Sequence, residues 1–335
     1  MRKALLGVCF ALASWSAYSQ KNPVAYGVNL AGADFGSTMP GEFDKTYTYP
    51  RPSELDYFKA KGLTLIRLPF KWERIQPKLN GPLDARELSR IKQVIKQAQQ
   101  RKLWVILDLH NYGRRQMDGT EYLIGSERVS IQHIGDLWQK LAQACRSYPN
   151  IWGYGLMNEP HDLRADTPWF SIAQHCITQI RKTDTKTAIL VGGDQWSSGE
   201  RWLRASDTLK YLKDPSRHLI FEAHVYFDKD GSGTYKHDYL TEEASAQKGI
   251  ERVKPFVNWL KANHFQGLVG EYGVPDTDPR WLETLDQFLA YLRENQVSGT
   301  YWAAGPWWGD YTLAVSPRDG TDRPQMKILE KYPTL

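Results

Sequence analysis

Eight short apolar segments, each followed by a stretch with helical periodicity, constrain the fold of this 335-residue chain more than any other feature. The segments are rich in β-branched and aromatic residues and are apolar throughout, which is typical of strands buried on both faces of a parallel sheet. The strand candidates are Ala25–Leu30, Thr64–Leu68, Leu103–Leu109, Ile151–Met157, Thr187–Gly192, Leu219–Tyr226, Leu268–Tyr272 and Thr300–Ala303.

The segments between these strand candidates carry the start signals of helices. Such signals are a proline in the first turn, or an N-cap residue placed three positions before a glutamate as in a capping box. The predicted starts are Ser53 before residues 54–61, Asp84 with Glu87, Thr167 before Pro168 and Asp278 before Pro279.

Eight pairs of a buried strand and an amphipathic helix predict an α/β fold, a closed (β/α)8 TIM barrel. Barrels of this length fold as one domain, so we expect a single catalytic domain over residues 20–335. An open doubly wound sheet is disfavoured because the Gly-rich first turn of that fold is missing from the sequence.

The first 19 residues are predicted to form a secretory signal peptide. Arg2 and Lys3 precede an apolar run over residues 4–13, and Ala17 and Ser19 offer small side chains to a signal peptidase. The run is too short to span a bilayer, and no later stretch approaches about 20 uninterrupted apolar residues. We therefore expect a secreted protein, extracellular or periplasmic, that does not bind a membrane.

Three cysteines occur in the chain. Lipid attachment at Cys9 is an alternative interpretation of the N-terminal segment, but Val8 stands where a small residue is expected. Cys145 and Cys176 lie on the apolar stripes of predicted helices, which favours two buried thiols. Export leaves a disulfide between them open.

Composition indicates a sugar polymer rather than a nucleic acid as the partner. The formal net charge of +5 falls to +3 (5 − 2) without Arg2 and Lys3, and such a mild charge does not favour nucleic acid binding. The 13 Trp and 18 Tyr residues exceed what a core requires. Their flat apolar faces match the C–H faces of pyranose rings.

Two glutamates stand at the exits of strand candidates. Glu159 follows the run at residues 151–157 and has an amide, Asn158, directly before it, while Glu271 ends the run that begins at Leu268. Cleavage of a glycosidic bond needs such a pair, one acid to protonate the leaving oxygen and one base to attack the anomeric carbon. The pair therefore predicts a glycoside hydrolase.

Further polar and aromatic residues lie at the ends of the other strand candidates. Side chains at the carboxyl ends of barrel strands face one shared pocket, so we expect these residues to form a single site. The expected set is Arg67, His110, Asn158, Glu159, His224, Tyr226, Glu271 and Trp302.

With these residues in this order, the chain resembles glycoside hydrolase family 5 from about Tyr26 to Trp308. Within that family, the segments Gly27–Gly36 (GVNLAGADFG), Met157–Asp162 (MNEPHD) and Ala303–Gly305 (AAG) are most similar to the secreted endoglucanases grouped as subfamily 5. The resemblance implies a TIM barrel that hydrolyses β-linked glucan.

The resemblance also implies roles for the residues that match. Glu159 would be the general acid/base and Glu271 the nucleophile. Asn158 would bind the 2-hydroxyl of the sugar at the cleavage point. Arg67 would pair with Glu271 and keep it ionised, because a guanidinium lowers the pKa of a neighbouring carboxylate.

Four more matching residues would support this pair. Tyr226 would donate a hydrogen bond to Glu271, and His224 would contact Glu159. His110 would bind sugar hydroxyls, and Trp302 would form the floor beneath the reacting ring.

Other aromatic residues fall in predicted loops, where each is either a sugar platform or a packing residue. Trp196 and Trp307 are the favoured platforms, and the remaining candidates are Trp72, Tyr112, Trp169 and Trp308. The turn-rich loop Asp228–Thr234 is expected to be a wall of the cleft. Asp108 is expected to brace the end of its strand, without a chemical role.

We therefore expect a monomeric, cofactor-free and metal-free retaining endo-β-1,4-glucanase that acts on β-glucan. No His-Glu-x-x-His spacing supports a metal site. The segment Tyr272–Val274 departs from the Thr-Gly-Gly form of fungal members, which leaves open mannan, xyloglucan, mixed-linkage glucan or a bacterial exopolysaccharide as the substrate. A non-catalytic polysaccharide-binding protein is the alternative from another class.

Overall fold

A computed structural model of the chain describes residues 21–334. The predicted signal peptide at residues 1–19 and the alternative lipid site at Cys9 lie outside the described residues. Secretion therefore stays a prediction.

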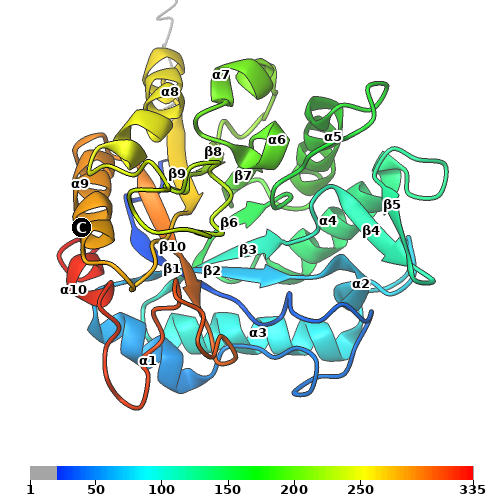
Figure 1. The fold of residues 1–335 in the computed structure, drawn as a ribbon. Coiled ribbons are helices and arrows are strands. Elements are labelled where there is room, and N and C mark those ends of the chain that lie inside the picture. The colour runs from blue at the N-terminus through cyan, green and yellow to red at the C-terminus, as the bar shows by residue number, and fades with distance from the viewer. Residues whose placement is uncertain (1–20, 335) are drawn as a thin grey trace, which may run out of the picture.

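Eight parallel strands close into a barrel in the order β1-β10-β9-β8-β7-β6-β3-β2, with helices around it (Figure 1). The predicted (β/α)8 barrel is confirmed, and the strand bounds differ from the predicted ones by one or two residues at some ends. The strands are β1 Tyr26–Leu30, β2 Leu65–Phe70, β3 Trp104–Leu109, β6 Ile151–Gly155, β7 Ile189–Gly192, β8 Leu219–His224, β9 Gln266–Glu271 and β10 Ser298–Ala304.

Helices cover the outside of the barrel. The long ones are amphipathic and turn their apolar residues toward the strands. They are α1 Pro52–Ala60, α3 Ala85–Gln100, α4 Ile131–Cys145, α5 Trp169–Arg181, α8 Lys248–Asn263 and α9 Arg280–Glu294; single turns form α2 Trp72–Ile75, α6 Asp194–Ser197, α7 Trp202–Ala205, α10 Met326–Leu329 and the 3-10 helix Asp207–Tyr211.

The predicted helix starts are right for α3 and wrong for α1. The Asp84 carboxylate accepts hydrogen bonds from the backbone N–H groups of Arg86 and Glu87, so Asp84 caps α3. Helix α1 begins at Pro52 rather than after Ser53, because proline fits the first helical position and needs no N–H there.

A separate apolar cluster fills the barrel near the starts of its strands. It contains one or more inward-facing side chains from most of the strands and is almost fully buried, with exposures of 0 to 2%. Because apolar side chains fill this end of the barrel, the functional groups must lie at the opposite, carboxyl end of the strands. Its members are Ala25, Leu65, Ile106, Trp152, Ala188, Leu190, Ile220 and Leu268.

A two-stranded hairpin after β3 is absent from our sequence prediction. Strands β4 (Arg114–Met117) and β5 (Thr120–Leu123) pair antiparallel, and both turn residues, Asp118 and Gly119, have positive φ. An Asp-Gly pair is a signal for such a turn. The signal was missed because the strands on either side of the turn are polar and lack the alternation of apolar and polar residues that predicts a strand.

Both described cysteines are free buried thiols, so the disulfide that we left open does not form in this structure. Cys145 ends α4 and Cys176 lies in α5, two helices that pack against each other. Burial raises the pKa of the Cys145 thiol to about 12. Neither thiol is therefore set up for nucleophilic chemistry.

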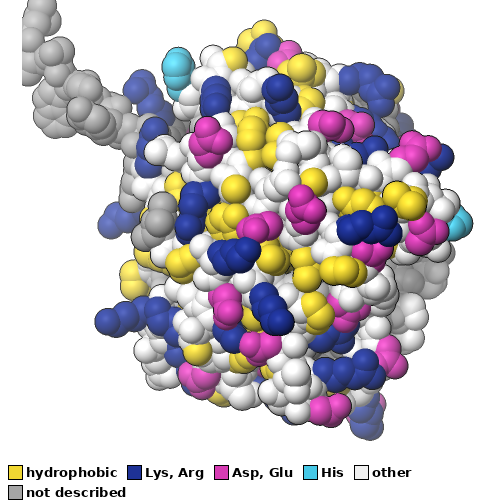
Figure 2. All heavy atoms as spheres, turned by 60° about the vertical axis from the view of Figure 1, so that its left-hand side comes forward, with side chains coloured by type: hydrophobic (Ala, Val, Ile, Leu, Met, Phe, Trp, Pro, Cys, Tyr) yellow, Lys and Arg dark blue, Asp and Glu magenta, His cyan; other side chains and the backbone are white. Residues whose placement is uncertain are grey.

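One face of the molecule shows interspersed charges. On the face drawn in Figure 2, Lys and Arg side chains alternate with Asp and Glu rather than gathering into a field of one sign. A nucleic acid backbone needs such a field. Within residues 21–334, no helix combines the length and the apolar character required to cross a membrane.

Candidate active site

Arg67 is the centre of charge at the carboxyl end of the barrel. Its side chain is buried and forms ion pairs with Asp108 at 3.0 Å, Glu222 at 2.9 Å and Glu271 at 3.1 Å. It also donates hydrogen bonds to the amide oxygens of Asn29 and Asn158. Three carboxylates can be buried together here because one guanidinium with five N–H donors compensates them.

Glu271 ends β9 and is almost fully buried. It accepts a hydrogen bond of 2.8 Å from the Tyr226 hydroxyl and one of 3.1 Å from Arg67. Burial raises the pKa of Glu271 to about 7, and the negative charge of Glu159 acts in the same direction. The cations of His224 and Arg67 oppose this rise but do not reverse it, so the predicted lowering of this pKa by Arg67 is wrong as a net effect.

Glu159 lies in the turn after β6, at a positive φ of 43°. Its side chain is 17% exposed, against 6% for Glu271, so it is the more accessible of the two carboxylates. Its Oε1 atom is 2.8 Å from Nδ1 of His224. Residues other than glycine rarely adopt positive φ, and such backbone strain clusters at functional sites.

His224 lies between carboxylates on both sides of its ring. Although burial opposes protonation, the carboxylates of Glu271, Glu159 and Glu222 raise the pKa of His224 to about 10. The imidazole is therefore a cation near neutral pH, and both nitrogens donate. Nδ1 donates to Glu159, and Nε2, at 3.2 Å, donates to Glu222.

The two candidate catalytic carboxylates are close neighbours. One oxygen of Glu159, one oxygen of Glu271 and a ring nitrogen of His224 all lie within 4.8 Å of one another. Three such atoms can share a metal ion, but His224 would first have to lose a proton that is held with a pKa of about 10. The charges therefore favour protons rather than a metal at this place.

His110 contacts both Asn158 and Trp302 at the carboxyl end of the barrel. Burial lowers the pKa of His110 to about 3, so its ring is neutral. Nδ1 of His110 is 2.7 Å from Asp108 and Nε2 is 3.3 Å from the amide nitrogen of Asn158. The ring of Trp302 stacks on His110 at a centroid distance of 5.4 Å and an angle of 11°.

Glu222 is a member of this network that our sequence analysis missed. It is buried in β8 and contacts both Arg67 and His224. A Cβ atom at residue 270 would lie 1.9 Å from its Oε1 atom, so Gly270 provides the space for this carboxylate. The signal was present: Glu222 stands two positions before His224, and alternate residues of a strand face the same side.

Asn29 and Asp108 also have a larger role in the site than the sequence predicted. Asn29 is buried in β1 and accepts a hydrogen bond of 2.8 Å from Arg67. Asp108 braces the end of β3, as predicted, but it does so by binding Arg67 and His110 at the centre of the site.

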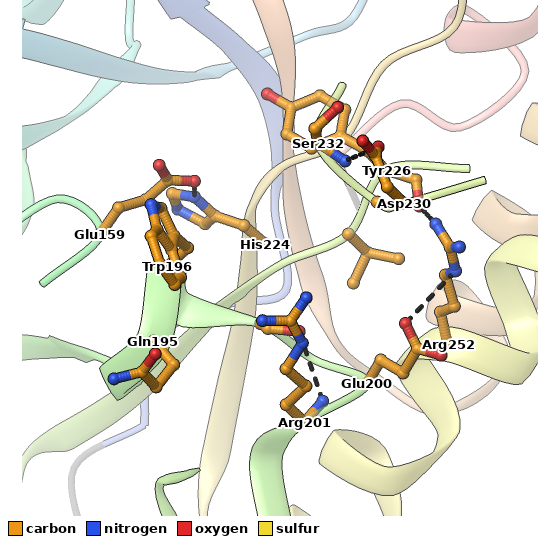
Figure 3. Close-up of a pocket in the computed structure, with 13 residues that line it drawn as sticks. Glu159, Gln195, Trp196, Glu200, Arg201, His224, Tyr226, Asp230, Ser232 and Arg252 are labelled. Carbon is orange, nitrogen blue, oxygen red and sulfur yellow. Dashed lines mark hydrogen bonds and ion pairs between the residues drawn. The ribbon is translucent and has the colours of Figure 1, made fainter. Parts of the chain in front are cut away.

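A cavity of about 430 Å³ opens beside Glu159 and His224 (Figure 3). Trp196 lines it and is 40% exposed. The indole stacks on His161 at a centroid distance of 4.3 Å and an angle of 13°. The loop Asp228–Thr234 contributes residues 230–232 to the lining, which confirms it as a wall of the site.

The other aromatic candidates divide between packing and exposure. Trp72 and Trp169 are buried, with exposures of 0% and 1%, so they are packing residues and not sugar platforms. Trp308 packs edge-on against Trp302 and Phe35.

Tyr112 contacts the ring of His110 and therefore lies in the site. Trp307 is 36% exposed. Within residues 21–334 its ring has no aromatic partner, so the structure does not link it to the catalytic network.

Comparison with known proteins identifies the family to which this site and fold belong. The sequence profile described as "Cellulase (glycosyl hydrolase family 5)" matches residues 27–307. Endo-beta-1,4-glucanase B of Aspergillus niger is 31% identical over 311 residues, which cover 92% of this chain and 89% of that protein.

Solved structures agree. Endoglucanase Cel5A of Pseudomonas stutzeri, in complex with cellobiose, superimposes with a TM-score of 0.86 at 39% identity, over 92% of both chains. XacCel5A in complex with cellopentaose superimposes with a TM-score of 0.85 at 41% identity, over 92% of this chain and 99% of that one. The match of profile, relatives and fold over nearly the same residues shows that the chain belongs to glycosyl hydrolase family 5.

Proposed function

We propose that the chain is a retaining endo-β-1,4-glucanase, with Glu271 as the nucleophile and Glu159 as the general acid/base. The observation that carries this proposal is the proximity of the two carboxylates, since one oxygen of Glu159 and one oxygen of Glu271 lie within 4.8 Å of each other. Retaining glycosidases hold their carboxyl groups about 5 to 5.5 Å apart, whereas inverting ones need roughly 6.5 to 9.5 Å to admit a water molecule.

In the first step, Glu271 attacks the anomeric carbon and forms an ester, while Glu159 gives its proton to the leaving oxygen. The hydrogen bonds from Tyr226 and Arg67 orient the Glu271 carboxylate for attack. In the second step, Glu159 removes a proton from water, the water attacks the same carbon, and the ester bond to Glu271 breaks. The configuration is inverted twice and therefore retained.

His224 supports both steps through Glu159. As a cation it donates from Nδ1 to the Glu159 carboxylate, which fixes that carboxylate and stabilises its ionised form after the first proton transfer. Asn158 is held by Arg67 and lies beside His110. Its amide is placed to bind the 2-hydroxyl of the reacting sugar, a contact that strengthens in the transition state.

A β-1,4-glucan is the substrate that the surroundings favour. Trp302 and Trp196 offer aromatic faces to pyranose rings, and the solved relatives include complexes with cellobiose and cellopentaose. The same catalytic groups would serve another β-linked polysaccharide, so the substrate must be measured. We further propose that the protein is exported, on the strength of the predicted signal peptide.

A panel of soluble polysaccharides tests this function. Carboxymethyl-cellulose should lose viscosity early, before much reducing sugar appears, because internal bonds are cut first. Mannan, xyloglucan and mixed-linkage glucan serve as competitors, and the variants Glu159→Gln and Glu271→Gln should bind the polymer without cutting it. Activity confined to mannan, or wild-type binding without cleavage, would contradict the proposal.

A further inference from the structure

The cavity beside Glu159 lies on the leaving-group side of the reaction. Its lining includes Glu159 and His224, but Glu271, His110 and Trp302 are not among the residues that line it. The proposed acid protonates the oxygen of the departing sugar, so the sugar next to this acid belongs to the leaving group. We call the cavity the leaving-group pocket and define it by Glu159, Trp196, Arg201, Asp230, Ser232 and Arg252.

One end of the leaving-group pocket is a rigid aromatic platform. Three successive residues, Gln195, Trp196 and Ser197, have left-handed φ values of 54°, 61° and 52°. Such a run is costly for residues with a side chain and persists where the surroundings impose it. The run presents the indole of Trp196 to the pocket, with His161 stacked behind it. This end suits the first sugar of the leaving group.

The other end of the leaving-group pocket carries a cation without a partner among the described residues, the guanidinium of Arg201. Figure 3 shows Glu159 and Trp196 at one end and Arg201, Glu200 and Arg252 at the other. The Arg201 side chain is exposed, and among residues 21–334 its guanidinium has no hydrogen bond or ion pair; the one hydrogen bond that Arg201 donates comes from its backbone N–H and goes to the Ser198 hydroxyl. Its guanidinium is therefore available to a ligand.

The neighbouring charges are already engaged. Arg252 donates to the carbonyl oxygens of Tyr226 and Lys229 and pairs with Glu200 at 3.4 Å. The Asp230 carboxylate accepts a hydrogen bond of 3.0 Å from the backbone of Ser232. Because two carboxylates accompany the two guanidinium groups, the far end favours a neutral group rich in hydroxyls over an anion.

We infer that Arg201 is a specificity-determining residue that binds hydroxyl oxygens of the second leaving-group sugar, a neutral glucosyl unit. This inference rests on the proposed function, because it takes Glu159 as the acid. The pocket volume of about 430 Å³ falls within the range of ligand sites, roughly 300 to 1,000 Å³. Arg201 donates to hydroxyl oxygens, and the Asp230 carboxylate, which also lines the pocket and has lone pairs left beside the one that Ser232 uses, accepts from hydroxyl groups.

Two substrates with different leaving groups test this inference on the variant Arg201→Ala. Cellopentaose places sugars in the whole leaving-group pocket, whereas p-nitrophenyl β-cellotrioside leaves as a nitrophenol that ends short of Arg201. We expect kcat/KM on cellopentaose to fall about tenfold, the effect of one charge-assisted hydrogen bond, and kcat/KM on the aryl glycoside to stay unchanged. Arg201→Lys should fall in between on cellopentaose.

The cleavage pattern gives a second readout. With cellopentaose labelled with ¹⁸O at its reducing end, the wild type should release labelled cellobiose, and Arg201→Ala should release relatively more labelled glucose. Arg204→Ala is the matched control, because Arg204 is an exposed arginine on the same segment that does not line the pocket.

The outcomes separate the inference from the proposed function. Equal kcat/KM and equal products for wild type and Arg201→Ala on cellopentaose would overturn the inference while leaving the proposed function intact. An equal loss on both substrates would also overturn it, because Arg201 would then act on the fold or the chemistry. If the wild type cleaved neither substrate, the proposed function itself would be wrong.

Discussion

Glu222 and Glu159 contact opposite nitrogens of one imidazole ring, that of His224. Glu222 lies 3.2 Å from Nε2 and Glu159 lies 2.8 Å from Nδ1. The Glu222 carboxylate is buried and does not contact Glu159, so it acts on Glu159 through the charge and orientation of His224, while its other ion pair is with Arg67. Glu222 is therefore a positioning residue.

Replacing Glu222 with glutamine should make His224 easier to deprotonate, because one of the anions that stabilise its cation is lost. We expect wild-type His224 to keep both imidazole protons from about pH 5 to 9, since its pKa is raised to about 10. Glu222→Gln should lose one of them within that range. ¹⁵N NMR of labelled histidine side chains measures this, and kcat should fall more than KM changes.

Glu200→Gln is the control for this experiment. Glu200 lines the leaving-group pocket and pairs with Arg252 rather than with His224. Identical histidine titrations for Glu222→Gln and wild type would show that Glu222 does not hold the proton on His224.

The pH profile should lose activity on its alkaline side near pH 7. The active form needs one proton on the carboxylate pair, with Glu159 protonated and Glu271 ionised. Burial raises the pKa of Glu271 to about 7, and because the two groups interact so closely, this value marks the loss of the last proton from the pair. Above it the pair has no proton left to give to the leaving oxygen.

The free-enzyme ionisation appears in kcat/KM measured against pH on a soluble cello-oligosaccharide. We expect kcat/KM to decline as pH rises through about 7. A plateau that extends two units further would contradict the assignment.

Arg67→Met should destabilise the barrel strongly. The substitution leaves three buried carboxylates, those of Asp108, Glu222 and Glu271, without their shared cation. Removing one partner of a buried ion pair typically costs about 3 to 5 kcal/mol in the free energy of unfolding. Urea unfolding measures the change, and Arg101→Met, which removes an exposed pair with Asp56, should leave the midpoint nearly unchanged. Equal midpoints for all three proteins would refute this account of Arg67.

Trp302→Ala should weaken substrate binding by about 1 to 3 kcal/mol, the scale of one aromatic stacking platform. Calorimetry with cellopentaose in a Glu159→Gln background isolates binding from turnover. Trp307→Ala is the matched comparison, because Trp307 is exposed on the following loop and has no aromatic partner among the described residues. An undiminished affinity in a folded Trp302→Ala protein would show that the sugar does not rest on this ring.

The barrel was predictable because its strands are apolar on both faces and alternate with amphipathic helices, a local pattern that sequence displays directly. The β4–β5 hairpin was not, since its strands Arg114–Met117 and Thr120–Leu123 are polar. Their pairing depends on contacts such as the hydrogen bonds of Arg115 to the carbonyl oxygens of Gln76 and Pro77. Such contacts lie far apart in sequence and leave no local pattern.

The residues of the site divide in the same way, into those that a local pattern predicted and those that depend on contacts distant in sequence. Strand-end placement and family resemblance located Glu159 and Glu271, but burial of charge was hidden from the sequence. Glu222 looks like any polar residue in an apolar strand until Arg67 is seen beside it. Trp72 and Trp196 look alike in sequence, and only their exposures of 0% and 40% separate a packing residue from a platform.

Proton NMR of the first product tests the central claim most directly. One oxygen of Glu159 and one of Glu271 lie within 4.8 Å of each other, which is the close spacing of retaining enzymes and not the wider one that admits a nucleophilic water, so Glu271 attacks the sugar itself. Hydrolysis of a cello-oligosaccharide should therefore release the β anomer first, followed by slow mutarotation to the α anomer. Initial release of the α anomer would mean an inverting mechanism and would contradict the roles proposed for both glutamates.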